Sequence, residues 1–403
     1  MLRPEIASVF PRILLVTPQP FYEDRGTPIA VRYVVQALSE LGAYVDILAF
    51  PVGSSVTIPR VTIMRCANPL RLKQVPIGFS WRKIALDATL WQAFSRLVSS
   101  GKYHMVHAVE DAAYMAAAIC PPVGQPFIYD MASAIPVELK RNALFATRLI
   151  QRLLSAAEKR VISAARSVVC SSGLAGYVSD QVPEARVREW QYPAYAERVD
   201  GYRALELRDQ LGIRRNQRVV LYSGNFAAYQ GIELLLQAFQ RARKIRPELA
   251  LVCVGATDKE FAERSEAMAA DAQVFILPRQ PRRQIPVFLE LADFLVLPRV
   301  AVDNVPLKLF DYMASGTPII ATRGPAHEPL LNESRAFMSE PTVEALSATL
   351  VDACASHHRS ESLGRAARSY ALENFGWDRF VDFVRTTYSD ALSETSELRR
   401  LVA

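Results

Sequence analysis

The stretch Asp303–Thr322 reads DNVPLKLFDYMASGTPIIAT, and its pattern predicts a helix, a tight turn and a buried strand. Pro306 suits the first turn of the helix, where its fixed φ and missing N–H cost little. Gly316 suits the position just past the helix end, and Pro318 prevents the helix from continuing. The apolar run Ile319–Ala321 then has the length of a short buried strand. This order of elements is typical of a parallel α/β sheet.

The same stretch carries groups that suit a nucleotide sugar. Asn304, Val305 and Leu307 would offer free backbone N–H groups at a helix N-terminus, and such groups bind phosphate. Asp303 and Asp311 stand eight positions apart and could accept hydrogen bonds from sugar hydroxyls. The alternative is an ordinary βα unit with two solvated acids.

Strand-length apolar runs alternate with helix-length segments along almost the whole chain, which predicts an α/β fold with two successive doubly wound domains. A linker near Tyr192–Tyr202 separates the two sets. The expected strands are Arg12–Val16, Tyr44–Phe50, Met105–Ala108, Phe127–Tyr129 and Ser167–Cys170, then Arg218–Tyr222, Ala250–Val254, Gln273–Ile276, Phe294–Leu297 and Pro318–Ala321. The expected helices include Pro28–Leu41, Arg82–Ser99, Leu144–Ala165, Ile232–Lys244 and a terminal one within Glu373–Ala391.

Composition limits the class of protein. The chain has 403 residues, of which 50% are hydrophobic and 22% charged, as expected for globular domains with a core. No run of eighteen uncharged apolar residues occurs, so we expect no transmembrane helix, and Ile13–Val16 is too short for a signal-peptide core. The five cysteines are scattered without a C-x-x-C pair, which indicates free thiols in a reducing cytoplasm.

The positive charge lies in the first half of the chain. Residues 1–195 hold 21 Lys and Arg against 14 Asp and Glu, whereas the whole chain has a net charge of +6. Two interpretations stay open: a solvated basic face, or an anionic partner such as a phosphorylated lipid or the inner face of the plasma membrane. Basic residues beside Trp81, Trp91, Phe94, Phe145 and Leu149 would suit an interfacial helix, although most of these apolar groups could instead pack in the core.

The segment PLKLFDYMASGTPIIAT resembles the donor-binding segment of GT-B glycosyltransferases of the family 4, or group 1, type. That family usually has two glutamates where this chain has Asp303 and Asp311. The resemblance implies that Asp303 approaches the transferred sugar and that Asp311 holds the ribose hydroxyls. Asn304, Val305, Pro306 and Leu307 would then surround the donor.

A glycine-bearing turn, Ser223–Gly231, follows the expected strand Arg218–Tyr222 and lets the backbone approach a pyrophosphate. It resembles the family segment in which an arginine and a lysine bind the donor diphosphate. Here Asn225 and Gln230, beside Gly224, stand at those positions and are neutral. We expect Lys308 or Arg299 to supply the missing charge, and the alternative for Lys308 is a surface lysine.

In the first half, Arg25-Gly26-Thr27-Pro28 stands where the family has a glycine-rich loop that meets the donor phosphates. Thr27 is a good N-cap, and Arg25 could reach the diphosphate or the acceptor or lie in solvent. The turn Leu277–Pro281, with Arg279, stands where related enzymes contact the base, and it does not identify uracil, guanine or adenine.

Polar residues follow two strands of the first half. His107, near the end of its strand, would point into the ligand crevice and contact the sugar or acceptor, or be a satisfied core residue. Glu110, Asp111 and Asp130 are candidates for binding acceptor hydroxyls.

The resemblance implies two Rossmann-like domains that face each other across a cleft. Residues 1–195 would bind the acceptor, residues 196–377 the nucleotide sugar, and residues 378–403 would form a helix that packs back on the first domain. It implies a retaining, metal-independent glycosyltransferase that acts in polysaccharide synthesis, with His107, Asp303 and Lys308 in catalysis. The donor would be of the UDP or GDP type, with no further cofactor and no nucleic acid partner.

Two other functions stay open. A sugar-nucleotide epimerase of the same two-domain form would need no acceptor site. A donor-binding pseudoenzyme or partner subunit would explain the neutral Asn225 and Gln230. The absence of a G-x-G-x-x-G after a strand argues against a dinucleotide oxidoreductase.

Overall fold

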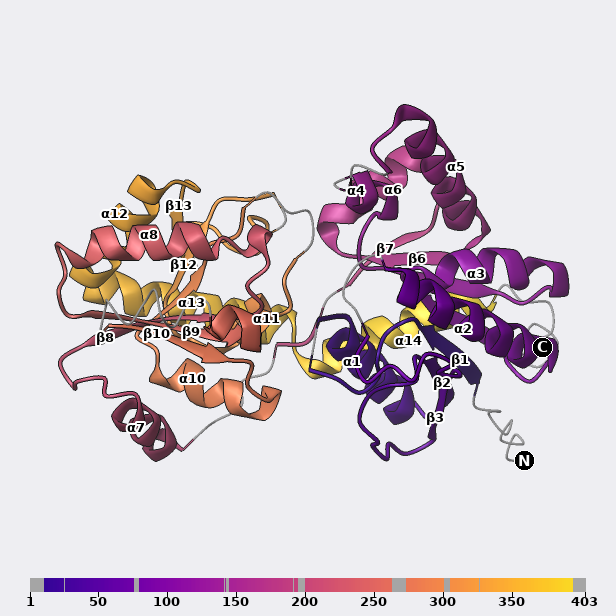
Figure 1. Ribbon diagram of the computed structural model, residues 1–403, viewed down its shortest axis with the longest axis horizontal. Helices are drawn as coiled ribbons and strands as arrows, with labels where there is room; N and C mark the ends of the chain where they lie inside the picture. Colours follow the sequence, from indigo (N-terminus) through magenta and orange to yellow (C-terminus); the bar gives the residue numbers. More distant parts are fainter. Residues whose placement is uncertain are drawn as a thin grey trace, which may run out of the picture. The chain divides into compact units, whose positions relative to one another are not determined.

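The computed structural model describes residues 11–24, 26–75, 80–140, 142, 145–190, 192–194, 200–262, 273–300, 305–325 and 327–393 (Figure 1). The chain divides into two compact units. One unit comprises Met1–Gln191 with Phe380–Ala403, and the other comprises Tyr192–Arg379. Each unit is a parallel sheet covered by helices, which confirms the predicted α/β class with two doubly wound domains.

The first unit contains a seven-stranded sheet in the order β3-β2-β1-β4-β5-β6-β7. Strand β1 pairs in parallel with both β2 and β4, so the strand order reverses between β1 and β4. Ligands of open α/β sheets bind at such a switch point, outside the carboxyl ends of the strands. The strands are β1 (Arg12–Thr17), β2 (Tyr44–Ala49), β3 (Val61–Arg65), β4 (Met105–Val109), β5 (Phe127–Met131), β6 (Ser167–Cys170) and β7 (Val187–Glu189).

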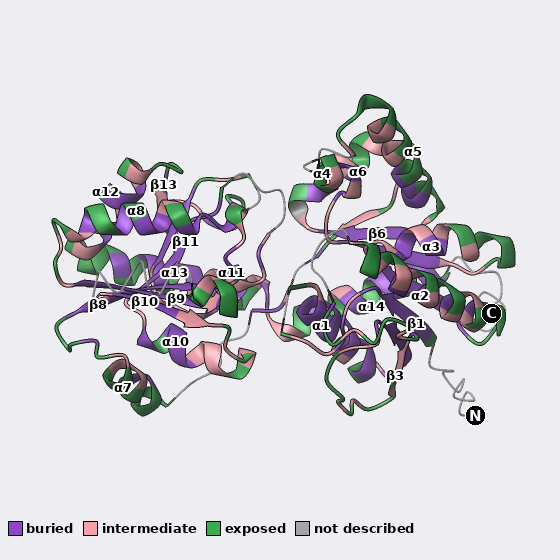
Figure 2. Cartoon of the chain, in the orientation of Figure 1, coloured by how far each residue is buried: buried purple, intermediate pink, exposed green. Residues whose placement is uncertain are grey.

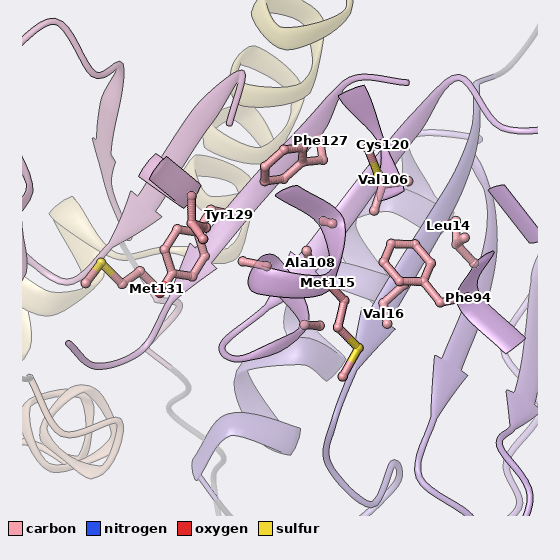
Figure 3. Close-up of a cluster of buried hydrophobic side chains, with 14 of the residues drawn as sticks. Leu14, Val16, Phe94, Val106, Ala108, Met115, Cys120, Phe127, Tyr129 and Met131 are labelled. Atoms are coloured by element: carbon pink, nitrogen blue, oxygen red, sulfur yellow. The ribbon is translucent and has the colours of Figure 1, made fainter. Parts of the chain in front are cut away.

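Helices cover both faces of this sheet. Alternate strand residues such as Leu14, Val106 and Phe127 pack under one helix layer, where Phe94 and Met115 meet them (Figure 3). That layer holds α2 (Trp81–Ser99), α3 (Ala112–Ile119), α5 (Arg148–Ala164) and α6 (Ser172–Gln181), and α4 (Ile135–Lys140) contacts α5. Two further helices of the first unit contact each other: α1 (Gly26–Glu40) meets α14 (Trp377–Ser393) through an edge-to-face pair of Tyr33 and Phe380.

The end of the chain forms two helices rather than one. Helix α13 (His357–Asn374) stops before Gly376, and α14 begins at Trp377. Phe380, Val384 and Tyr388 of α14 are buried, as their spacing on one stripe predicts. The unit boundary falls between Arg379 and Phe380 within α14.

The second unit contains a six-stranded sheet in the order β10-β9-β8-β11-β12-β13, with its switch point between β8 and β11. Its strands are β8 (Arg218–Ser223), β9 (Leu249–Ala256), β10 (Val274–Pro278), β11 (Phe294–Leu297), β12 (Ile319–Thr322) and β13 (Phe337–Ser339). One face packs under α7 (Gly201–Gln210), α10 (Ile285–Leu291), α11 (Lys308–Ser315) and α13, and the other under α8 (Ile232–Arg243) and α12 (Val343–Ala355). The central strands of both sheets are buried, and the outer sides of the helices are exposed (Figure 2).

Helix α11 begins slightly later than the sequence predicts. Leu307 is its N-cap, so Pro306 precedes the helix instead of occupying the first turn. The helix ends as predicted, because Gly316 is the C-cap with φ of 80° in the left-handed region. Strand β12 follows directly and is fully buried.

Within the described ranges, every helix is either too short or too polar to cross a membrane.

Candidate functional site

The carboxyl edge of the second sheet, at its switch point, gathers most of the predicted donor residues. Gly224 follows β8, Arg299 follows β11, and Lys308 opens α11. Because β8 and β11 are neighbours in the sheet, these three residues come from separate parts of the chain to one edge.

Lys308 lies in the centre of this group. Its Nζ donates to the Tyr222 hydroxyl at 3.0 Å and to the Gln230 Oε1 at 3.1 Å. The ammonium also lies 4.1 Å from the centre of the Tyr222 ring. Desolvation, and then the nearby Arg299, hold the pKa of Lys308 well below its usual value. Both hydrogen-bond partners are uncharged, so an anion would be the natural counter-charge for this ammonium.

The backbone beside Lys308 requires glycine. Gly224 has φ of 147°, and a Cβ built there would lie 2.3 Å from the Lys308 Nζ. The backbone is held in place because the Gly224 N–H donates to the Val254 carbonyl and the Tyr222 hydroxyl donates to the Asn225 carbonyl. Asn225 is exposed, and its side-chain oxygen accepts the Ala227 N–H. The turn therefore approaches the lysine without a side chain between them.

Arg299 is the second cation at this edge. It is buried, its guanidinium carbon lies 5.6 Å from the centre of the Tyr229 ring, and burial lowers its pKa. The Arg299 carbonyl accepts the Thr322 hydroxyl at 2.6 Å, which ties the end of β11 to the end of β12. His327 donates through Nε2 to the Thr322 carbonyl, and burial lowers the pKa of this histidine. His327 can therefore serve as a neutral support beside Arg299.

Asp311 projects from the first turn of α11 and is paired with Arg282. Arg282 donates to both carboxylate oxygens, from Nη1 at 3.1 Å and from Nη2 at 3.2 Å. This forked geometry fixes the orientation of the carboxylate. A carboxylate of this kind accepts hydrogen bonds from hydroxyl groups.

The remaining donor candidates line the same edge. Val305 and Leu307 are half-buried and Pro306 is buried, immediately before α11. Arg279 follows β10, and its N–H donates to the Ala256 carbonyl. Arg25, Asp303 and Asn304 lie outside the described residues.

In the first unit, Glu110 lies at the switch point. Its Oε1 accepts the Thr27 hydroxyl at 2.9 Å and its Oε2 accepts the Gln19 amide at 2.7 Å. Glu110 has φ of 50°, which is unusual for a residue with a side chain. Burial, and then Asp111, raise the pKa of Glu110. Thr27 lies inside α1 just after Gly26, so it is not the helix cap that the sequence predicts.

Asp111 forms an ion pair with Lys83 of α2 next to Asp87. Burial and the nearby Asp111 raise the pKa of Asp87 to about 7. Asp111 is the carboxylate in contact with Lys83, and the charges of Asp87 and Glu110 are near enough to help raise the pKa of that lysine. Such a group of carboxylates can accept hydrogen bonds from several hydroxyls.

His107 and Asp130 lie elsewhere, in the core of the first unit. His107 is fully buried, with Nε2 at 3.2 Å from an Asp130 oxygen and Nδ1 at 2.6 Å from the Tyr388 hydroxyl. The Trp190 indole N–H donates to the other Asp130 oxygen at 2.7 Å. The network joins β4, β5 and α14, and each member already has its partner within the unit. This geometry favours the satisfied core histidine over the residue that contacts substrate.

Sequence reasoning missed Arg282, Tyr222 and His327. Arg282 was overlooked because it lies 29 residues from Asp311 and belongs to no motif. Tyr222 looked like a strand residue, although its hydroxyl supports Lys308. A signal existed for Tyr222 alone, since it directly precedes the glycine-bearing turn.

Part of the chain is similar to known proteins. Residues 204–370 match the family model described as "Glycosyl transferases group 1". A lipopolysaccharide 1,2-N-acetylglucosaminetransferase of Salmonella typhimurium is 24% identical over 225 residues, which is 53% of this chain and 59% of that protein. The chain spans about half the length of the curated relatives it matches.

Solved structures share the whole fold. Sucrose-phosphate synthase from Thermosynechococcus elongatus has a TM-score of 0.76 at 18% identity, covering 96% of this chain and 100% of that one. Anabaena Alr3699/HepE, solved with UDP and glucose, has a TM-score of 0.72 at 15% identity, covering 94% of this chain and 99% of that one. At these identities, the likeness shows the fold alone.

Proposed function

Because this chain carries a group 1 glycosyl transferase domain on the GT-B fold, we propose that it transfers a sugar from a nucleoside diphosphate to a hydroxyl acceptor. One observation carries the proposal: at the switch point of the second unit, the Lys308 ammonium is held by uncharged groups beside a glycine turn. A diphosphate would supply the missing negative charge and could approach closely through Gly224. We propose a UDP or GDP type of donor because neighbours such as HepE bind UDP, and we propose no further cofactor.

The two cations would stabilise the leaving group. As the bond between the sugar and the diphosphate breaks, negative charge grows on the phosphate oxygen, and Lys308 with Arg299 would stabilise that charge. A preorganised donor of this kind contributes on the order of 3 kcal/mol to the transition state. Asp311 would accept the ribose hydroxyls while Arg282 holds its carboxylate in place. Val305 and Leu307 would add backbone N–H groups at the start of α11.

We also propose that the transfer retains the anomeric configuration of the sugar and requires no metal. The acceptor hydroxyl would attack the face from which the diphosphate leaves and would pass its proton to a phosphate oxygen. The two cations near the proposed phosphate site could supply positive charge that a metal supplies in other enzymes. Asp303 remains proposed as the acid that faces the sugar.

The first unit would bind the acceptor. Glu110, Asp111 and Asp87 cluster at its switch point and can accept hydrogen bonds from sugar hydroxyls. The acceptor class we propose is a glycan or a lipid-linked glycan, which agrees with the lipopolysaccharide named for one relative. Residues 1–195 would be the acceptor domain and residues 196–377 the donor domain, with residues 378–403 returning to the first.

A panel of nucleotide sugars tests the proposal. One of them should raise the melting temperature of the intact protein, and Lys308→Ala and Asp311→Ala should each reduce that shift. If no nucleotide sugar raises the melting temperature, the donor site is wrong. Nucleotide binding followed by neither transfer nor hydrolysis would instead support a donor-binding partner subunit, which the neutral Asn225 favours. Conversion of the donor without an acceptor would support an epimerase.

A further inference from the structure

Helix α2 exposes an apolar stripe that its own core packing does not use. Trp81 is 65% exposed, Ile84 54% and Trp91 42%, and Ala88 between them is also exposed. The spacing of three, four and three residues places all four on one side of the helix. The core side of α2 is separate and consists of Leu86, Leu90, Phe94 and Val98. Two exposed tryptophans on one helix are unusual for a surface that faces only water.

Helix α5 repeats this feature. Leu149 is 69% exposed and Leu153 63%, one turn apart on its outer side. The buried side of α5 holds Val161 and Ile162. Both helices pack on the same face of the first sheet, and α3 between them contacts each one. The two apolar stripes therefore belong to one helical layer (Figure 1).

The exposed charges of α2, α3 and α5 have one sign. The exposed charged residues of α2, α3 and α5 are all basic: Arg82, Arg96, Arg148, Arg152, Lys159 and Arg160. The two carboxylates of these helices are turned inward. Asp87 is partly buried beside Lys83, and Glu158 is fully buried, where it accepts the Tyr177 hydroxyl and the Ile135 N–H. Placement of the acids, and not only their number, gives α2, α3 and α5 a positive surface, whereas the adjoining α4 and α6 expose Glu138 and Asp180.

We propose that the surface formed by α2, α3 and α5 of the first unit docks on an anionic lipid bilayer. Tryptophan rings favour the boundary between lipid headgroups and acyl chains, and leucine side chains bury in it. Basic side chains on the same face are attracted to acidic headgroups within about 10 Å at ordinary ionic strength. A protein partner or a second copy of this chain would explain the tryptophans, but neither explains why every exposed charge of α2, α3 and α5 is basic.

Vesicle binding tests the surface directly and requires no nucleotide sugar, so its result is independent of the proposed glycosyl transfer. The intact protein should sediment with vesicles of phosphatidylglycerol and phosphatidylcholine and should bind pure phosphatidylcholine far more weakly. Trp81→Ala with Trp91→Ala should weaken partition at least about tenfold. Arg148→Gln with Arg152→Gln should cost about fivefold per removed charge and should flatten the salt dependence.

A matched control uses an exposed aromatic residue of the other unit. Tyr202→Ala in α7 removes a ring that is as exposed as Trp81 and should leave vesicle binding unchanged. The tryptophan variants should keep the melting temperature of the intact protein, because the stripe lies outside the core. Tryptophan emission should be quenched by brominated acyl chains in the intact protein and much less in Trp81→Phe with Trp91→Phe. Equal binding to both vesicle types, binding unaffected by the tryptophan and arginine changes, or a dimer that the tryptophan changes dissociate would each overturn the proposal.

Discussion

The ammonium of Lys308 lies 3.1 Å from the side-chain oxygen of Gln230, so a lysine from α11 reaches the turn that follows β8. In the family that this chain resembles, the position of Gln230 normally carries the cation itself. The positive charge is thus brought to the same place from a different element.

Replacing Lys308 with Met should remove the charge and keep most of the volume. We expect transfer to fall by about a hundredfold or more, because one preorganised donor is lost from the leaving diphosphate. Steady-state kinetics with the donor identified by melting shifts would measure the loss. Lys244→Met, at the exposed end of α8, is the matched control and should leave activity unchanged. Unchanged turnover in Lys308→Met would remove Lys308 from the proposed site.

Moving the charge back should restore part of the activity. Gln230→Lys in the Lys308→Met background places an ammonium on the turn again, where it can reach the same oxygen atoms. The single change Gln230→Lys should instead lower the melting temperature, because two ammonium groups would be crowded into a poorly solvated site. Kinetics and melting curves of the two variants would check this. A double variant no more active than Lys308→Met would show that position and charge are not interchangeable.

The lowered pKa of Lys308 predicts proton uptake when the donor binds. Burial and Arg299 disfavour the ammonium in the free protein, whereas a diphosphate would favour it and raise the pKa. Between the two pKa values the complex holds a proton that the free protein lacks, so donor affinity should fall as pH rises through this window. Calorimetry in buffers of different ionisation enthalpy would detect the uptake, which should vanish in Lys308→Met.

The lowered pKa of Lys308 also makes the stability of the free protein depend on pH, and here the effect rises with pH whereas donor affinity falls. An unfolded chain keeps the lysine protonated up to its ordinary pKa, and the folded chain releases the proton earlier. Stability of the free protein should therefore rise with pH between the lowered and the ordinary pKa. Lys308→Met should flatten that part of the stability profile measured by denaturant unfolding.

Much of the fold could be predicted from the sequence because buried strands are continuous apolar runs. Strand β11 (Phe294–Leu297) and strand β6 (Ser167–Cys170) begin and end where predicted. The short strands β3, β7 and β13 were missed, since sequences such as Val187-Arg188-Glu189 lack both an apolar run and an alternating pattern. Their pairing depends on neighbouring strands that lie far away in sequence.

The site was predictable where a local pattern implies a local shape. The Gly316 cap follows from one short segment. For Lys308 the sequence predicts a role for the charge, but its contact with the turn 78 positions away at Gln230 depends on the packed sheet. Pairings between distant residues did not follow, and Arg282 with Asp311 and His107 with Tyr388 show why. Neither pair belongs to a motif, and only the packed sheet brings the partners together.

Arg282 should affect donor binding by orienting the Asp311 carboxylate, which is proposed to hold the ribose. Arg282→Gln leaves the carboxylate without its forked partner, and we expect donor affinity to weaken by roughly tenfold or more. The loss should shrink sharply with donors that lack the ribose hydroxyls, in Arg282→Gln and in Asp311→Ala alike. Arg283→Gln, at the next position, is the control. An equal loss with ordinary and deoxyribose donors would place Arg282 outside ribose binding.

His107 should matter for stability more than for turnover. The arrangement that satisfies every group has Nε2–H donating to Asp130 and Nδ1 accepting the Tyr388 hydroxyl. Tyr388→Phe removes one buried hydrogen bond and should lower the free energy of unfolding by about 1 kcal/mol or more. His107→Ala should cost more, because it also opens a cavity and leaves Asp130 with fewer donors. Denaturant unfolding measures both losses, and activity of the remaining folded protein should stay near that of the unaltered chain. A large fall in turnover without a loss of stability would instead place His107 in contact with substrate.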